Sequence, residues 1–216
     1  MPDDGDATRR SYDEIAADYA RLIGDELDAK PFDRALLAAL AELAVDGPLA
    51  DIGCGPGHVA AYLATLRAAP VGLDLSPRMC AIGASTTGLP FAAADMTALP
   101  LRTGSLAGVV CLYAVIHLDA AARASAYREF ARVLRSGGHL LVSFHTRDAE
   151  LPLGGSRDLT AMMGHDVELT FHFLDPDVEQ RLLSEAGFAI VARLDRAPHE
   201  GAEHPSDRSY LIMRTD

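Results

Sequence analysis

The residues best suited to chemistry lie in one glycine-rich stretch near the start of the chain. It reads Asp51-Ile52-Gly53-Cys54-Gly55-Pro56-Gly57-His58 and includes the end of the apolar run 49–52. Glycines at a strand-to-helix turn let the backbone bend sharply and leave room for a ligand to lie against it. Asp51 adds a carboxylate that can meet the ammonium of an amino-acid moiety. The stretch therefore predicts a ligand site at the carboxyl end of a strand.

The spacing of these glycines differs from that of a dinucleotide-binding turn. Such a turn reads G-x-G-x-x-G, with the last glycine allowing close packing of helix on strand. Here that place holds His58, and the third glycine, Gly57, comes one residue earlier. This pattern disfavours a nicotinamide-dependent oxidoreductase. A turn that serves only to join a strand to a helix remains an alternative.

Two further acidic residues follow at the ends of later apolar runs. Asp74 comes about 20 residues after the turn, where an acid can accept hydrogen bonds from ribose hydroxyls. Asp95 and Met96 end a third run and are placed for the amino group and the flat face of adenine. Each acid alone can be a solvated carboxylate, but together they describe a nucleoside with a cationic amino-acid arm.

Elements that would position these residues are indicated by hydrophobic periodicity. Helical patterns and short apolar runs alternate, which predicts βαβ units and a parallel sheet. The expected helices are 9–23, one starting after Lys30 with Pro31 in its first turn, 58–67, 76–84 and 120–134; the expected strands are 49–52, 71–75, 89–94, 106–115 and 138–144.

The C-terminal part of the chain follows a different pattern. Asp175-Pro176 starts a helix that runs through Leu183, and the runs 187–194 and 209–213 read as two strands without a helix between them. We expect these strands to pair as neighbours, with the last one antiparallel. The long stretch 148–170 lies before them.

The order and spacing of these motifs resemble those of class I S-adenosylmethionine-dependent methyltransferases of the bacterial small-molecule type. The matching segments are Asp51-x-Gly53-x-Gly55-x-Gly57, Gly72-Leu73-Asp74-Leu75-Ser76-x-x-Met79, Asp95-Met96, Glu129-Phe130-x-Arg132-Val133-Leu134-x-x-Gly137-Gly138 and the C-terminal 173–188. The resemblance covers nearly the whole chain. It implies an α/β, Rossmann-like, mostly parallel sheet of order 3-2-1-4-5-7-6, with strand 7 antiparallel and helices on both faces.

The same resemblance implies one methyltransferase domain, 1–216, in three parts. Residues 1–46 would form a helical lid, 47–146 the cofactor-binding core, and 147–216 the substrate-side insertion and C-terminal hairpin. Within the last part, the stretch 148–170 would cover the substrate. The cofactor would be S-adenosylmethionine, leaving as S-adenosylhomocysteine, with no metal. Its predicted contacts are Tyr12, Tyr19, Asp51, Gly53, Cys54, Gly55, Gly57, Asp74, Leu75, Met79, Asp95, Met96, Leu112 and Tyr113.

Histidines are the candidates for acid–base work, because imidazole titrates in the physiological range. A base is needed only if the acceptor carries a proton that must leave. His117, after the fourth strand, is the first catalytic candidate, and His145, at the end of the fifth, is the second. Met162 and His165 are candidates for substrate binding. Each of these side chains also has a purely structural interpretation, as packing or hydrogen-bonding groups.

Composition narrows the class of partner. The net charge of −12 and the scattered arginines disfavour nucleic acid. Three isolated cysteines argue against a disulfide framework and a zinc knuckle, and favour a cytoplasmic setting. The polar stretch from Met1 to Arg10 shows no secretory signal, and no apolar run is long enough for a membrane span. We expect a monomer or homodimer that acts on a small molecule.

The sequence does not identify the atom that accepts the methyl group. We favour oxygen, with nitrogen as the next candidate. An alternative activity is a cyclisation or rearrangement by an enzyme that binds S-adenosylmethionine without transferring its methyl group, since the cofactor motifs would look the same. A purely structural or protein-binding module would have no need of three strand-end acids. The alanine- and arginine-rich composition is typical of a bacterial protein.

Overall fold

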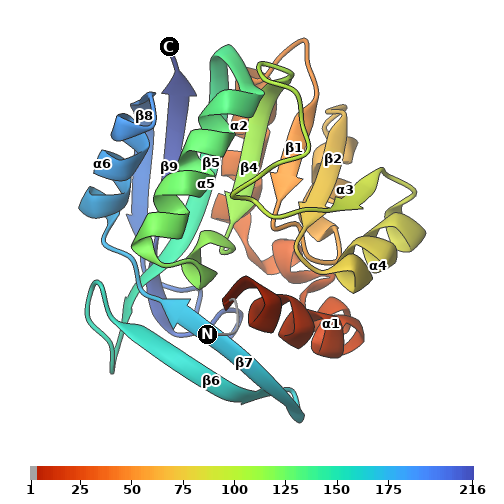
Figure 1. The fold of residues 1–216 in the computed structure, drawn as a ribbon, viewed down its shortest axis with the longest axis vertical. Coiled ribbons are helices and arrows are strands. Elements are labelled where there is room, and N and C mark those ends of the chain that lie inside the picture. Colours follow the sequence, from red (N-terminus) through yellow and green to blue (C-terminus); the bar gives the residue numbers. More distant parts are fainter. Residues whose placement is uncertain (1–3) are drawn as a thin grey trace.

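The computed structural model describes residues 4–216, which are built around one seven-stranded sheet (Figure 1). Its order is β3-β2-β1-β4-β5-β9-β8, with β9 antiparallel to both neighbours. The order and the antiparallel strand confirm the predicted sheet, in which β8 and β9 are the sixth and seventh strands. The strands are β1 (Leu49–Ile52), β2 (Pro70–Asp74), β3 (Phe91–Ala93), β4 (Leu106–Leu112), β5 (Leu134–Asp148), β8 (Phe188–Arg196) and β9 (Ser206–Thr215).

Helices cover both faces of this sheet, because its central strands carry apolar side chains on both sides. On one face α2 (Pro31–Leu43) and α3 (His58–Thr65) pack on residues such as Val110 and Leu141. On the other face α5 (Ala120–Val133) and α6 (Pro176–Glu185) pack on residues such as Val109 and Val142. These two cores fix the carboxyl ends of the parallel strands along one edge.

Short polar side chains fix the starts of the helices that leave this edge. Ser76 begins α4 (Pro77–Thr87) by accepting a hydrogen bond from the backbone N–H of Met79. Asp119 does the same for α5, and Asp175 for α6. Each cap satisfies a backbone donor that the helix itself leaves free.

The insertion before α6 was predicted as a cover, but its strands were not predicted. It forms a separate two-stranded sheet of β6 (Ser156–Met162) and β7 (His165–His172). Apolar side chains at Val167, Leu169 and Phe171 alternate with polar ones, which is the period of a half-exposed strand. The connecting Met163 and Gly164 both have positive φ, as a two-residue hairpin turn requires.

Several element bounds also differ from the sequence prediction. The first helix, α1 (Asp4–Ile23), starts five residues earlier than expected. The fourth strand ends at Leu112, because Tyr113 takes a positive φ of 55° and Val115–His117 then forms the 3-10 helix η2. The lid segment was predicted from residue 1, and residues 1–3 lie outside the described part of the chain.

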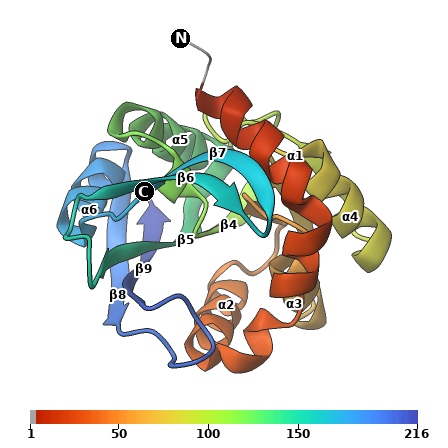
Figure 2. The ribbon, with the colours of Figure 1, turned by 90° about the horizontal axis from the view of Figure 1, so that it is seen from below.

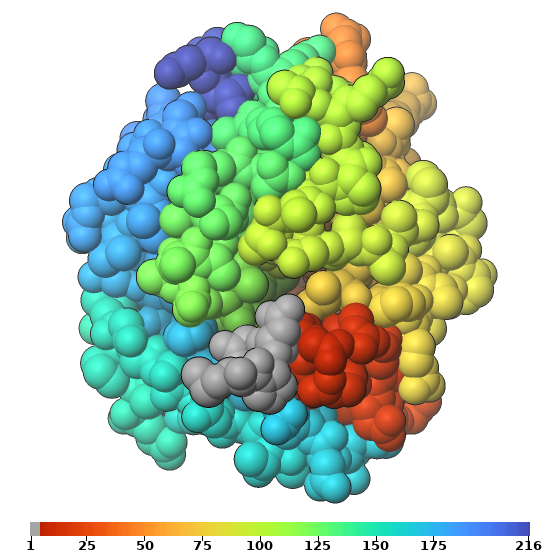
Figure 3. All heavy atoms as spheres, viewed as in Figure 1, coloured from red at the N-terminus to blue at the C-terminus, as the bar shows by residue number. Residues whose placement is uncertain are grey.

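Helix α1 and the β6–β7 hairpin lie together across the carboxyl edge of the sheet (Figure 2). Ile15 of α1 forms a small apolar cluster with Val167 and Leu169 of β7. Ser11 accepts a hydrogen bond from the backbone N–H of Glu168 at 2.8 Å. The space-filling view shows α1 and the hairpin in contact at the lower end of the molecule (Figure 3). None of the helices within residues 4–216 has the length and apolar composition needed to cross a membrane.

A buried hydrogen-bonded triad of Glu179, Arg123 and Tyr127 joins α5 to α6 and gives a test of the packing. Glu179 is 1% exposed and accepts hydrogen bonds from Arg123 Nε at 3.1 Å and Tyr127 Oη at 2.6 Å. Removing the carboxylate leaves a buried guanidinium without its counter-ion. We expect Glu179→Ala to lower the free energy of unfolding in urea by about 3–5 kcal/mol.

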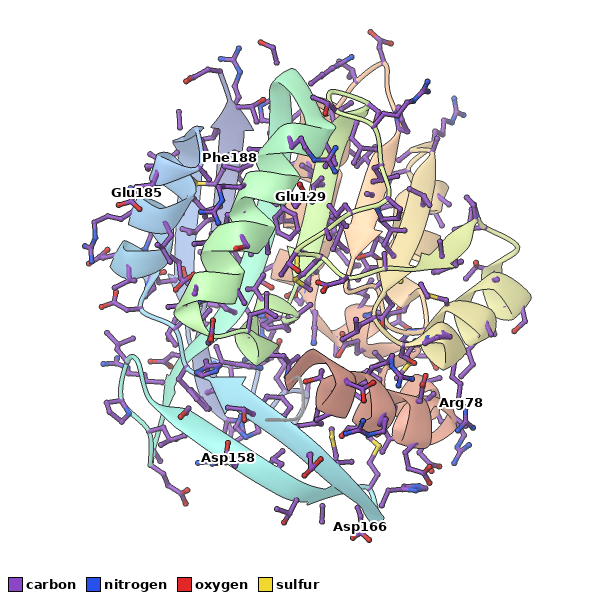
Figure 4. All side chains as sticks on the ribbon, in the orientation of Figure 1. Arg78, Glu129, Asp158, Asp166, Glu185 and Phe188 are labelled. Atoms are coloured by element: carbon purple, nitrogen blue, oxygen red, sulfur yellow. The ribbon has the colours of Figure 1, made fainter. Side chains whose placement is uncertain are left out.

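The matched control for this variant is Glu185→Ala in the same helix. The side chain of Glu185 is exposed and points away from the sheet (Figure 4). Such a surface change should stay within about 0.5 kcal/mol. Equal losses of stability in the two variants would contradict the role given to the triad.

Candidate functional site

The glycine-rich turn that follows β1 contains three residues in the left-handed conformation. The φ angles of Gly53, Gly55 and Gly57 are 71°, 52° and 88°. A Cβ atom at Gly57 would lie 2.5 Å from the ring of Phe91, and one at Gly53 would lie 2.2 Å from Cβ of Ala114. These two glycines are therefore required by packing as well as by conformation.

At Gly55 the surroundings are more open. The nearest atoms to a Cβ there would be Tyr19 and Ile23 of α1, at 3.9 and 4.0 Å. The backbone of the turn thus faces the helix predicted to be the lid. The Cys54 side chain is buried, so this residue offers a ligand mainly its backbone.

Asp74 ties the glycine turn to the start of α4. Its Oδ2 accepts a hydrogen bond from Gly55 N and its Oδ1 accepts one from Ser76 N, both at 2.8 Å. Burial raises the pKa of this carboxyl, while the two backbone donors oppose the rise. Leu75 is half-buried and Met79 buried beside it. The carboxylate keeps lone pairs free for further donors.

Asp51 is a buried carboxyl with an unsatisfied oxygen. It is 2% exposed, and its Oδ2 has no hydrogen-bond partner among residues 4–216. Burial, and then the charge of Asp74, raise the pKa of Asp51 to about 8. A buried polar atom without a partner requires an explanation, and a cationic donor from a ligand would provide one.

Asp95 and Met96 follow β3 at the same edge. Asp95 is exposed, and its Oδ1 accepts hydrogen bonds from the backbone N–H and the hydroxyl of Thr97. Cε of Met96 would lie 3.7 Å from a Cβ atom at Gly53, so this side chain reaches the glycine turn. All three predicted acids therefore stand at the carboxyl ends of successive strands.

Helix α1 is fixed above these strand ends by aromatic and polar contacts. The rings of Tyr12 and Tyr19 meet edge-to-face, with centroids 5.7 Å apart. Asp13 Oδ1 accepts hydrogen bonds from the Ser76 hydroxyl at 2.6 Å and from Arg78 N at 3.2 Å. The role of Asp13 was not predicted, because the start of α4 lies more than 60 residues away in the sequence.

His117 joins α1 to β7. Its Nδ1 lies 3.1 Å from the carbonyl oxygen of Thr170, and its Nε2 lies 2.7 Å from the hydroxyl of Tyr12. Because a carbonyl only accepts, Nδ1 carries the proton and Nε2 accepts from Tyr12. Phe171 packs edge-on to the imidazole at 4.7 Å. Burial among these groups lowers the pKa of His117 to about 4, so the ring is neutral at pH 7.

His145 contacts Tyr113 and Ser206, a different set of residues from those around His117. The rings of His145 and Tyr113 stack with centroids 5.0 Å apart, and His145 Nδ1 lies 2.8 Å from the hydroxyl of Ser206. Burial, and then the nearby Arg208, lower the pKa of His145 to about 3. The Tyr113 hydroxyl lies 2.5 Å from that of Tyr210 on β9. Leu112, just before Tyr113, packs on the α2 side of the sheet.

The predicted substrate contacts Met162 and His165 both belong to the hairpin. Met162 packs on the cluster around Ile15, and His165 meets Glu14 at 3.2 Å and Asp18 at 2.8 Å. The neighbouring Asp166 marks the far tip of the hairpin in Figure 4. These two side chains connect the hairpin to α1. Within the described part of the chain, no three His, Cys, Asp or Glu side chains group as metal ligands.

Comparison with known proteins agrees with this geometry. A family model described as a methyltransferase domain matches residues 49–138. An O-methyltransferase of Pyrenophora dematioidea is 29% identical over 158 residues, which cover 69% of this chain and 57% of that protein. The chain spans 29% to 66% of the length of four curated relatives that it matches.

Solved structures show the same fold over the whole chain. Magnesium protoporphyrin IX methyltransferase from Synechocystis PCC 6803, with bound SAH, is 16% identical and has a TM-score of 0.74, with 99% of this chain and 100% of that chain covered. The [4+2]-cyclase SpnF is 20% identical and has a TM-score of 0.72, with 100% and 97% covered. The domain model that matches residues 49–138, the strand order and the three strand-end acids make this chain similar to the class I S-adenosylmethionine-dependent methyltransferases in sequence motifs and in fold.

Proposed function

We propose that the protein transfers the methyl group of S-adenosylmethionine to an oxygen, or alternatively a nitrogen, of a small molecule. The observation that carries this proposal is the buried Oδ2 of Asp51 beside the glycine turn, which has no hydrogen-bond partner among residues 4–216. An amino-acid ammonium supplies the missing donor and the missing positive charge. The matching methyltransferase domain and the name of the Pyrenophora relative support the type of reaction.

The described residues fit S-adenosylmethionine in three places. Asp51 would hold the ammonium of the methionyl arm, Asp74 the ribose hydroxyls, and Asp95 with Met96 the adenine. Gly55 leaves its side of the turn open toward Tyr19. When bound, the cofactor supplies an electrophilic methyl group on a sulfonium.

The protein's own contribution would be to position the acceptor and exclude water. In-line displacement needs the nucleophile held near the methyl group in a dry pocket, without a covalent enzyme intermediate. Helix α1 and the β6–β7 hairpin already lie over the strand ends. Tyr113, directly after β4, would border the sulfonium.

Calorimetric titration with S-adenosylhomocysteine tests this proposal directly, with NADH as the parallel control. We expect micromolar binding of the first ligand and none of the second, because the glycine spacing and the strand-end acids suit a cationic nucleoside. Binding of NADH alone would overturn the proposal. With binding established, product mass then reports the reaction.

Product mass also separates the second candidate activity, cyclisation or rearrangement without methyl transfer. The observation in its favour is the likeness to SpnF, whose structure covers the whole chain at a TM-score of 0.72. Methyl transfer adds one carbon and two hydrogens to the acceptor, whereas a rearrangement leaves the mass unchanged.

The raised pKa of Asp51 predicts a pH dependence of cofactor binding. In the free protein this carboxyl is protonated below about pH 8, and an ammonium ligand favours its ionised form. Binding below that pH must therefore release a proton. We expect the affinity for S-adenosylhomocysteine to rise by up to about tenfold per pH unit between about pH 6 and about pH 8, and then to level off.

The control for this profile is Asp51→Asn, which keeps the shape of the side chain but does not titrate. Its affinity should be weaker and nearly independent of pH over the same range. A wild-type profile as flat as that of the variant would show that Asp51 does not meet the ammonium.

His117 remains the proposed base, because its Nε2, which accepts a hydrogen bond from Tyr12 in this structure, is unprotonated when the ring is neutral. We expect His117→Gln to lower kcat by about 100-fold or more while the affinity for S-adenosylhomocysteine stays within about twofold. Glutamine can still accept from Tyr12 and donate to the carbonyl of Thr170. Full activity of this variant would therefore assign His117 to holding α1 and β7 together.

A further inference from the structure

A second group of ionisable side chains lies beside Tyr113, outside the proposed cofactor contacts. It draws on the start of α2, the end of β8, the start of β9 and the loop between those two strands. Its members share one hydrogen-bonded and ion-paired network, and they are Lys30, Asp33, Arg196, Glu203, Arg208 and Tyr210.

The charges of this network are deeply buried. Arg196 donates to Asp33 at 2.9 Å and to Glu203 at 2.7 Å, and Arg208 donates to Glu203 at 2.9 Å. The exposed fractions of the Arg196 and Arg208 side chains are 7% and 2%. Replacing buried ion pairs by apolar side chains is often neutral or stabilising. Stability alone therefore does not account for this network.

Two cations of the network, Lys30 and Arg208, lie over the ring of Tyr113 and near His145. Lys30 Nζ is 5.4 Å from the centroid of the Tyr113 ring, and the Arg208 guanidinium is 5.7 Å from it. Arg208 and Lys30 lower the pKa of His145 more than the carboxylate of Glu203 raises it. Burial, and then the carboxylate of Asp33, raise the pKa of Tyr113, and Lys30 also pairs with Glu26 at 2.7 Å, so this wall presents both cations and carboxylates.

Unsatisfied polar atoms are concentrated in the same place. Among the described residues, Arg196 Nε, Arg208 Nε and Ser143 Oγ are buried without a hydrogen-bond partner. Asp33 Oδ1 and His199 Nε2 are also unpaired there. Buried polar atoms are normally paired with protein groups, water or ligand. Two free N–H donors on buried guanidinium groups require acceptor oxygens.

We propose that this network is the acceptor subsite and that it binds the carboxylate of a small-molecule acid. The inference rests on the proposed methyl transfer and names the class of acceptor. Arginine suits this role because its planar N–H donors match the geometry of a carboxylate. A carboxylate held by these cations is a weak nucleophile, so it anchors the acceptor while another oxygen or a nitrogen meets the methyl group near Tyr113.

The test uses small acids and their amides as probes: acetate with acetamide, and benzoate with benzamide. Binding to the full-length protein is measured by ligand-observed NMR, with and without saturating S-adenosylhomocysteine. We expect at least one acid to bind about tenfold or more tightly than its amide, and Arg208→Gln to remove that preference. The affinity of this variant for S-adenosylhomocysteine should stay unchanged.

Arg147→Gln is the matched control, because it removes the same charge from the same edge of the sheet. Its side chain is 65% exposed and pairs with Asp207. This variant should keep the preference for acids. If circular dichroism shows that Arg208→Gln does not fold, Lys30→Met takes its place with the same expectation.

Two results would overturn the proposal: equal binding of each acid and its amide to the wild-type protein, or an unchanged preference in the folded Arg208→Gln or Lys30→Met variant. Either result would assign the network to holding α2 against β8 and β9. Failure of S-adenosylhomocysteine to bind would instead contradict the proposed function, and the titrations without it report on the acid subsite separately.

Discussion

The hydrogen bonds accepted by Asp74 are the interaction on which the rest of the site depends. One carboxylate holds Gly55 of the turn after β1 and Ser76 at the start of α4. Ser76 in turn donates to Asp13 of α1. The glycine turn, the second helix of the cofactor half and the covering helix are thus positioned through a single half-buried side chain. A parallel sheet makes this arrangement possible, because its strand ends converge on one edge.

Burial gives this edge its electrostatic character. Burial raises the pKa of Asp51 to about 8, and it lowers the pKa of His117 to about 4 and that of His145 to about 3. All three side chains are therefore neutral at pH 7 when no ligand is bound. A sulfonium placed there would meet few mobile counter-charges. Methyl transfer consumes this positive charge. A surrounding without water therefore raises the free energy of the charged ground state more than that of the product state. Helix α1 and the β6–β7 hairpin lie over this edge, and in the proposed reaction their role is to exclude water.

Much of the cofactor half could be predicted from the sequence, because its residues stand directly at the ends of strands. The turn at 53–57, Asp74 and Asp95 each follow an apolar run, and chain order alone places them at one edge. The hairpin was missed, although the alternation of Val167, Leu169 and Phe171 carries its signal. That alternation spans few residues and lies in a polar stretch, so periodicity alone did not separate it from a loop.

The network beside Tyr113 could not be predicted in the same way. Lys30 and Arg208 are more than 170 residues apart in the sequence, and neither belongs to a motif. They meet because β9 returns antiparallel beside β5, which brings the start of β9 to the edge where α2 begins. Tyr113 stands between the two halves, with a positive φ that costs of order 1–3 kcal/mol in a residue with a side chain. Its hydroxyl donates to Tyr210, since Tyr210 already donates to Asp33. The acceptor side is therefore encoded by long-range topology, whereas the cofactor side is encoded by local motifs.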